Sequence, residues 1–126
     1  MKQIIETEKV PAAIGPYSQA VIYNGIVYCS GQIALDPDTM KLTGNDIEAQ
    51  SRQVMKNLGE LLSASGSSFS DVLKCSIFLA DMDDFGKVNK IYGDYFQDNP
   101  PARETVAVKT LPKNALVEIS CIAISR

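Results

Sequence analysis

The sequence Pro100-Pro101-Ala102-Arg103-Glu104-Thr105-Val106-Ala107-Val108 is followed, after Leu111-Pro112-Lys113-Asn114, by Leu116-Val117-Glu118-Ile119. Residues 103 to 109 and 115 to 125 alternate with a period of two and are rich in Val and Ile, which is typical of strands that face a core or an interface. Arg103 and Glu118 place charges in these apolar strands. Such a charge persists only when something pairs with it, and a small carboxylate is a suitable partner for a guanidinium. Both residues are therefore leading site candidates.

The connection between these strands bears on how the two charges meet. If the strands form a hairpin around Pro112-Lys113-Asn114, Glu118 lies opposite residue 108, roughly 16 Å along the strand from Arg103 at about 3.3 Å per residue. Side chains that hold a small molecule would struggle to bridge that distance. We therefore expect the site to be assembled across two chains, or by strong curvature of the sheet, and activity to require the oligomer.

Four further strand segments are expected upstream. Residues 18 to 23 and 26 to 30 predict a hairpin around Asn24-Gly25, because this dipeptide readily adopts the positive φ angles of a tight turn. A short strand is expected at residues 2 to 5. Another strand is predicted by apolar residues that alternate with Lys74, Ser76 and Phe78, namely Leu73, Cys75, Ile77 and Leu79.

Two helices are expected between these strands. Asn45 predicts the N-cap of the first helix, with Glu48 completing a capping box, and Gly66 ends it. Pro100-Pro101 are expected to end the second helix. The second helix is predicted by apolar residues at helical spacing: Phe85, Val88, Ile91, Tyr92, Tyr95 and Phe96.

This order of elements predicts an α+β fold with a mixed sheet and both helices on one face. The other face of the sheet is left uncovered, and its expected side chains include Val, Ile, Ala and Cys. Such a face needs a partner, and self-association is the simplest one.

Composition narrows the class of protein. The 126 residues, of which 45% are hydrophobic and 21% charged, predict one globular domain spanning 1–126. The net charge of -3 and the sequence pI of 4.8, with scattered Lys and Arg, argue against a nucleic-acid or anionic-membrane partner.

The chain contains no histidine, which excludes Ser-His-Asp, Cys-His and HExxH chemistry. Its three cysteines, Cys29, Cys75 and Cys121, each lie in an apolar strand and predict buried, inert thiols in a reducing compartment. The first residues have no apolar run long enough for a signal peptide or a membrane span, so we expect the protein in the cytoplasm.

Several motifs resemble the reactive intermediate deaminase A family, also called the YjgF/YER057c/UK114 family. They are Ile14-Gly15-Pro16-Tyr17-Ser18-Gln19-Ala20, Ser30-Gly31-Gln32-Ile33, Val88-Asn89 and the segment from Pro101-Ala102-Arg103 to Ile119. The resemblance covers essentially the whole chain. It implies a chorismate-mutase-like fold and a homotrimer with inward-facing sheets and clefts at the subunit interfaces.

The same resemblance implies hydrolytic deamination of 2-imino acids such as 2-iminobutanoate and 2-iminopropanoate, which protects pyridoxal-phosphate enzymes, with no cofactor or metal. In that chemistry Arg103 binds the carboxylate in bidentate fashion, and Glu118 orients the water and accepts its proton. Tyr17, stiffened by Gly15-Pro16, donates or accepts a hydrogen bond near the imine nitrogen.

The remaining candidates bind the substrate. Gly31 lets backbone approach the ligand, and the backbone N–H of Thr105 binds the carboxylate. Ser30 and Asn89 complete the set. Thr105 stands where many bacterial relatives carry cysteine, so a thiol role is in doubt while the backbone role stands.

Structural roles remain open for each candidate. Arg103 and Glu118 are alternatively an interface ion pair, or Glu118 is a device that keeps an edge strand soluble. Tyr17 is alternatively a packing residue, Gly31 a turn residue, and Asn89 a residue that ties down a loop.

Three other functions are alternatives to the deaminase. A non-catalytic module would bind small carboxylates through Arg103 and would not need Glu118. Endoribonuclease activity, known in part of the family, is disfavoured by the acidic pI and by the lack of a basic aromatic stripe. A chaperone role leaves no mark in the sequence.

Overall fold

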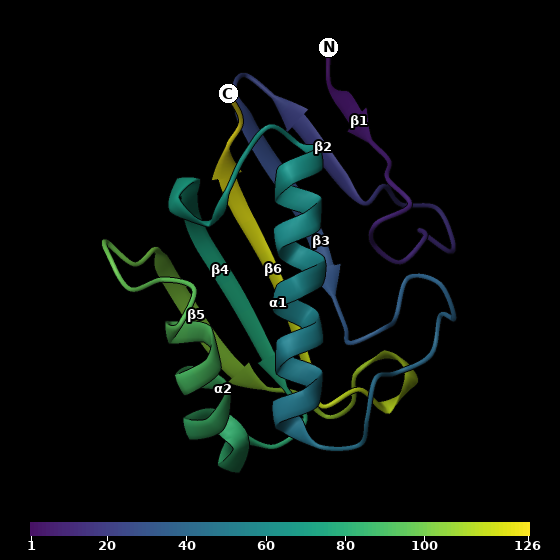
Figure 1. Cartoon of the computed structure of the whole chain (residues 1–126), viewed down its shortest axis with the longest axis vertical. Coiled ribbons are helices and arrows are strands. Elements are labelled where there is room, and N and C mark those ends of the chain that lie inside the picture. Colours follow the sequence, from purple (N-terminus) through teal and green to yellow (C-terminus); the bar gives the residue numbers. More distant parts are fainter.

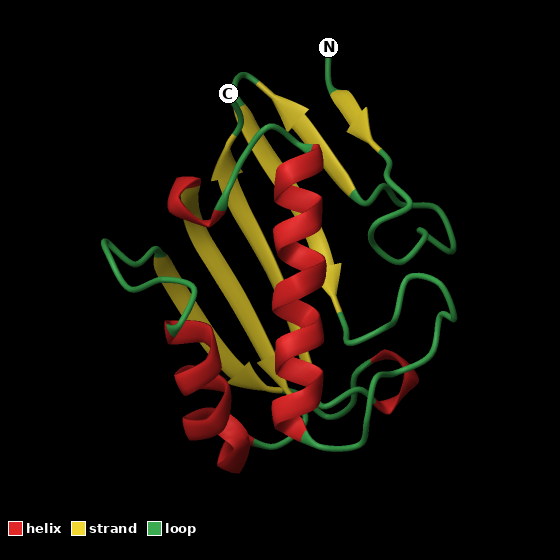
Figure 2. Cartoon of the chain, in the orientation of Figure 1, coloured by secondary structure: helices red, strands yellow, loops and turns green.

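A computed structural model describes residues 1–126 and has a six-stranded mixed sheet with two helices packed against one face (Figures 1 and 2). This confirms the predicted α+β class. The strand order is β1-β2-β3-β6-β4-β5. The elements are β1 (Gln3–Ile5), β2 (Ala20–Tyr23), β3 (Ile26–Gln32), α1 (Ile47–Ala64), β4 (Val72–Leu79), α2 (Phe85–Gly93), β5 (Ala102–Ala107) and β6 (Val117–Ile124), with one-turn 3-10 helices at Phe69–Asp71, Met82–Asp84 and Pro112–Asn114.

The expected hairpin between the last two strands is wrong. β5 pairs in parallel with β4, and β6 pairs antiparallel with both β4 and β3, so β4 separates β5 from β6. β6 takes a central place because every second residue is buried, whereas β5 is an exposed edge strand. The order β4-α2-β5 is a strand-helix-strand unit, whose crossover connection brings its two strands together in parallel.

The predicted β2–β3 hairpin is confirmed, with Asn24 at φ 51° and Gly25 at φ 75° in its turn. The predicted N-cap of α1 is wrong by one residue. Asp46 Oδ1 accepts a hydrogen bond of 2.7 Å from the backbone N–H of Ala49, in place of Asn45. Asn and Asp cap about equally well, so the sequence pattern alone does not choose between them.

The burial of Leu73 and the end of α2 also differ from the prediction. Leu73 is 44% exposed, because the register shifts between Val72 and Lys74 and takes Leu73 out of the buried row. α2 ends at Gly93, well before Pro100-Pro101, although Phe96 still packs in the core. A glycine costs about 1 kcal/mol in a helix relative to alanine, which favours this earlier end.

The core is one cluster of 23 buried residues between the sheet and the helices. β6 supplies four of them from one face, Val117, Ile119, Cys121 and Ala123. Figure 1 shows α1 lying along the sheet over its central strands. No helix is both long and apolar enough to cross a membrane.

The three cysteines are free and buried, as predicted. Cys29, Cys121 and Cys75 are direct cross-strand neighbours in the core, so the expectation of Cys on the uncovered face is wrong. The hydrogen bond with Cys29 and burial raise the pKa of Cys121, and burial raises the pKa of Cys75. These thiols are therefore poor nucleophiles.

The opposite face of the sheet is uncovered in the single chain, as predicted. Tyr23 and Tyr28 are each 50% exposed on it. Lys74 Nζ forms an ion pair of 3.0 Å with Glu104, which also accepts a hydrogen bond from Ser76. The Ser76 hydroxyl and the Lys74 ammonium lower the pKa of Glu104.

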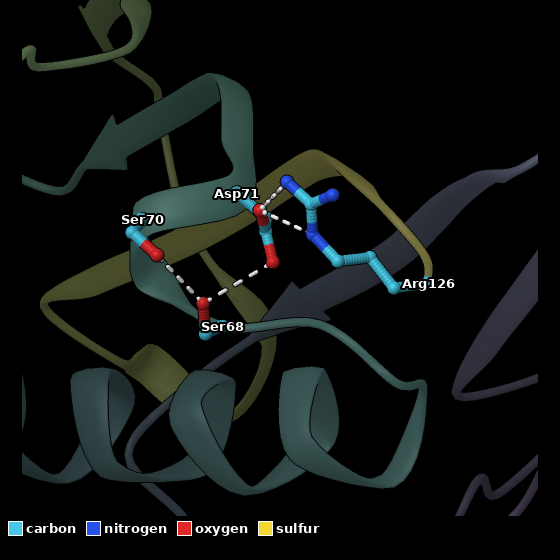
Figure 3. A network of polar contacts seen from close by, with 4 residues as sticks. All are labelled: Ser68, Ser70, Asp71 and Arg126. Carbon is cyan, nitrogen blue, oxygen red and sulfur yellow. Dashed lines mark hydrogen bonds and ion pairs between the residues drawn. The ribbon is translucent and has the colours of Figure 1, made fainter.

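An ion pair ties the end of β6 to the turn before β4 (Figure 3). Arg126 donates to Asp71 Oδ1 from Nη2 at 2.8 Å and from Nε at 3.1 Å. Ser68 donates to the other carboxylate oxygen at 3.3 Å. The hydrogen bond from Arg126 lowers the pKa of Asp71.

Candidate functional site

A cleft of about 670 Å³ lies beside β3 and β6 and contains four of the predicted site residues. We call it the Glu118 cleft. Tyr17, Ser30, Gly31 and Glu118 all line it, although Tyr17 precedes β2 and Glu118 belongs to β6. Ser30 is held in place by a hydrogen bond of 2.6 Å from its Oγ to the Ser18 carbonyl.

Gly31 makes room for the Glu118 side chain. A Cβ added at Gly31 would lie 2.6 Å from Glu118 Oε2 and 2.9 Å from its carboxyl carbon. Gly31 falls where the β3–β6 register shifts between Cys29 and Gln32. A close-approach role for this glycine is therefore visible in the structure, and its contact is with the carboxylate of Glu118.

Glu118 has no side-chain hydrogen bond or ion pair within the chain, and burial raises its pKa above the usual 4.5. A carboxylate that forms no ion pair keeps its lone pairs available for a water molecule. Its raised pKa also makes it a stronger base than an exposed glutamate.

Arg103 lies outside this cleft, near the start of β5, against one side of α2. Its Nη1 donates a hydrogen bond of 2.7 Å to Asn89 Oδ1. Its Cζ lies 5.4 Å from the ring centroid of Phe85 and 5.0 Å from that of Tyr92. We call these four residues the Arg103 cluster. Burial raises the pKa of Tyr92, so its ring is neutral beneath the guanidinium.

The Arg103 cluster leaves part of the guanidinium free. Asn89 occupies one of its five N–H donors, and an aromatic contact uses the face of the group rather than its edge. The other donors remain available for a carboxylate. In this arrangement Asn89 contacts Arg103 and holds its orientation.

Thr105 lies two residues after Arg103 and pairs with Ile77, a core residue. Its Oγ1 is buried and has no hydrogen-bond partner. Thr105 thus shares a face of β5 with Arg103 and does not line the Glu118 cleft.

Arg103 and Glu118 point to opposite faces of the sheet. Arg103 is level with Cys75 and, one strand further, with Cys121, both in the core beneath the helices. Glu118 pairs with Phe78 and alternates along β6 with the buried core residues. Its side chain therefore lies on the uncovered face. Two strand spacings and three residues separate the two Cα positions, about 14 Å in all.

The structure thus divides the predicted site residues into two groups. The Glu118 cleft holds Tyr17, Ser30, Gly31 and Glu118, while Arg103, Asn89 and Thr105 lie together near α2. Of the two predicted environments of β5, a core or an interface, the structure excludes the core: the strand is mostly exposed in the single chain, and only Thr105 is half-buried.

Some residues of both groups were missed as site candidates. Phe85 and Tyr92 were placed only in an apolar helix face, but their spacing of seven residues, with Asn89 between them, was a signal that all three share one side of α2. Met40 and Lys113 line the Glu118 cleft from separate loops. Nothing in the local pattern around either residue indicates this. No group of three or more Cys, Asp and Glu side chains is arranged to hold a metal ion.

Comparison with known proteins adds an independent line of evidence. The family model described as endoribonuclease L-PSP matches residues 7–125. Reactive Intermediate Deaminase A, chloroplastic, of Arabidopsis thaliana is 51% identical over 122 residues, which span 97% of this chain and 65% of that relative. The 2-iminobutanoate/2-iminopropanoate deaminase of Rattus norvegicus is 47% identical over 124 residues, spanning 98% of this chain and 90% of the relative.

A solved structure has the same fold throughout. The crystal structure of Escherichia coli TdcF with bound serine has a TM-score of 0.93 and 37% sequence identity, and the match covers 98% of this chain and 99% of that one. The two groups of candidate residues therefore lie on a fold that is shared along nearly the whole chain.

Proposed function

The chain belongs to the endoribonuclease L-PSP family, and from this premise we propose that it hydrolyses 2-imino acids to 2-keto acids and ammonia. Relatives that match almost the whole chain are named 2-iminobutanoate/2-iminopropanoate deaminase and Reactive Intermediate Deaminase A. One observation carries the proposal: the matched residues include both Glu118, which is unpaired in a cleft, and Arg103, which has free N–H donors.

In the proposed reaction, the free N–H groups of Arg103 bind the substrate carboxylate. Glu118 accepts a proton from water as the water oxygen bonds to the imine carbon, and it returns this proton to the nitrogen of the tetrahedral adduct. The C–N bond of the adduct then breaks as its hydroxyl group loses a proton to solvent and becomes the keto oxygen, which releases ammonia and the keto acid. The protonated C=N bond is already electrophilic, so positioning the water supplies much of the catalysis. Tyr17 also lines this cleft, and in the proposed reaction it hydrogen bonds with the nitrogen.

Arg103 and Glu118 have to come from different chains in this proposal. Their opposite faces and separation of about 14 Å prevent one small substrate from contacting both in a single chain. The uncovered sheet face, with its half-exposed Tyr23 and Tyr28, supplies a surface for self-association. We therefore propose a homotrimer whose sites each combine one chain's Arg103 cluster with a neighbour's Glu118 cleft.

We also propose that residues 1–126 are one domain, which is supported by their single core cluster. For the compartment we propose the cytoplasm, since the three thiols are free and buried. The A. thaliana relative is named chloroplastic. Cell fractionation with an antibody to the protein tests this assignment.

The proposed activity is tested by coupling the protein to a threonine dehydratase and trapping the released imine with semicarbazide. The protein should reduce semicarbazone formation and accelerate appearance of the keto acid. Arg103→Ala and Glu118→Gln should abolish the effect. Arg126→Ala is a matched control, because its ion pair with Asp71 lies away from both groups of candidate residues. No change in imine lifetime with wild-type protein would refute the proposal.

Binding of a small carboxylate without catalysis is a second candidate, favoured by the serine in the TdcF structure. It would use the Arg103 cluster and leave Glu118 without a chemical role. Ligand affinity that is lost in Arg103→Ala, together with an unchanged cellular phenotype in Glu118→Gln, would favour this function.

Endoribonuclease activity is a third candidate, favoured by the description of the family model. The pI of about 4.8 opposes it, because a polyanion needs a basic surface. Salt-sensitive RNA cleavage that survives extensive purification and disappears in Arg103→Ala would support it.

A further inference from the structure

A tight loop at residues 36 to 41 presents one side chain to the Glu118 cleft. Asp36 Oδ1 accepts hydrogen bonds from the backbone N–H groups of Asp38 and Thr39, at 2.8 and 3.1 Å. The backbone N–H of Met40 donates to the Asp36 carbonyl at 2.8 Å. These bonds fix the backbone of the loop, and Met40 lines the cleft.

Met40 has an unfavourable backbone conformation for its residue type. Its φ is 59°, in the left-handed region where glycine or asparagine is normally preferred. Nearby Gly44 has φ 98° and is a glycine, as this region favours. Position 40 thus carries a long apolar side chain where the backbone favours glycine or asparagine, and conflicts of this kind are concentrated at functional sites.

The Glu118 cleft offers such a role because part of its lining is apolar. Besides Met40, the apolar lining residues include Pro11, Ile14, Ile33, Leu35 and Pro112. 2-Iminopropanoate carries only a methyl group beyond its reacting carbon and would contact little of this surface, whereas a longer side chain would contact more of it.

We propose that Met40 determines substrate specificity by contacting the apolar side chain of the 2-imino acid. The inference rests on the proposed deaminase function and names the substrates within it: 2-imino acids with longer unbranched apolar side chains are preferred to 2-iminopropanoate. The methionine side chain is unbranched and flexible, so it adapts to chains of different length. Each methylene that leaves water on binding contributes about a fourfold gain in affinity.

The test compares a homologous series of imines. A broad-specificity amino-acid oxidase generates them from alanine, 2-aminobutyrate, norvaline and norleucine, and competition with semicarbazide gives kcat/KM for each. The variants are Met40→Gly and Met40→Asn, which both fit the left-handed backbone and remove the apolar side chain, and Met40→Leu, which keeps an apolar group. Asn24→Gly is the control. It also introduces glycine at a left-handed position, in the β2–β3 turn away from the cleft, and so tests whether relief of backbone strain by itself changes the substrate preference.

Wild-type protein should prefer the norleucine-derived imine to the alanine-derived imine. Met40→Gly and Met40→Asn should reduce this preference by about fivefold or more, mainly by lowering kcat/KM for the norleucine-derived imine. Met40→Leu and Asn24→Gly should retain it. An unchanged preference in Met40→Gly overturns the inference and leaves the deaminase function standing. Wild-type protein that hydrolyses none of the imines overturns both.

Discussion

Arg103 and Glu118 lie on opposite faces of the same sheet, with β4 between their strands. One face is packed beneath the helices and the other is open to a neighbouring chain. Under the proposed function, the two charges that stand out in the sequence are therefore parts of separate half-sites, and this proposal leads directly to a test of how they meet.

Mixing two inactive variants should restore activity. If each site takes Arg103 from one chain and Glu118 from the next, Arg103→Ala and Glu118→Gln trimers that are unfolded together and refolded will contain some intact sites. Random mixing in equal amounts should recover about a quarter of wild-type activity, since a mixed trimer keeps one intact site of three. Each variant refolded alone is the control. Mixed trimers without activity would place both residues in the same site of one chain.

Arg103→Ala should lower kcat/KM by about 10²-fold or more, equivalent to about 3 kcal/mol, because two charge-assisted hydrogen bonds to the substrate are lost. Arg103→Lys should recover only part of this, since an ammonium cannot form the bidentate pair or stack as a guanidinium does. Steady-state kinetics measure both effects. Equal activity of the Lys variant and the wild type would show that charge alone is sufficient.

Asn89→Ala should raise KM by about tenfold and affect kcat less, because the hydrogen bond from the Arg103 guanidinium that orients this side chain is worth roughly 1.5 kcal/mol. Asn89→Asp should not rescue binding, since a carboxylate at this position competes with the substrate for the guanidinium. The comparison separates a residue that orients Arg103 from one that contacts substrate. A large fall in kcat alone would indicate the latter.

Gly31→Ala should reduce kcat strongly while the protein remains folded. The added Cβ meets the carboxylate of Glu118 at 2.6 Å, and this flexible side chain has to move away. Thermal unfolding and kcat are measured on the same sample. Activity close to wild type would mean that the position of the Glu118 carboxylate is not critical.

Glu118→Gln should stabilise the fold at neutral pH. Burial raises the pKa of Glu118 above 4.5, so the folded state holds its proton more tightly than the unfolded state does. The ionised group therefore costs stability, and the cost grows as pH rises from the unfolded pKa through the folded pKa. The Gln variant should have a higher Tm than wild type at pH 7, and the difference should vanish below about pH 4. A lower Tm at pH 7 would contradict this.

The sequence was sufficient to predict the secondary structure and that Arg103 and Glu118 lie far apart. It was not sufficient to predict the strand order that separates them, with β4 between β5 and β6. Alternation in residues 115 to 125 identified β6, and Asn24-Gly25 identified a hairpin, because both signals are local. The placement of β4 between β5 and β6 depends on which strand buries more apolar area, which no short window contains. The N-cap depended on a choice between adjacent Asn45 and Asp46.

The site residues also divide into those that the sequence predicted and those that it did not. Tyr17, Ser30, Gly31 and Glu118 were predicted from motifs and lie in one cleft. Met40 was not predicted, because its importance rests on a positive φ and on a loop that folds back to the cleft. Phe85 was treated as a core residue, since an aromatic at helical spacing looks the same whether it packs on leucine or on a guanidinium.

The packing of Arg103 against α2 also bears on the entropy of ligand binding. A free arginine loses about 2 kcal/mol of rotamer freedom when it is immobilised, but this guanidinium is already held by Asn89 and two rings before any ligand arrives. Most of that loss occurs when the chain folds. Binding of a carboxylate is then a reaction of a preorganised receptor, in which little conformational freedom remains to be lost.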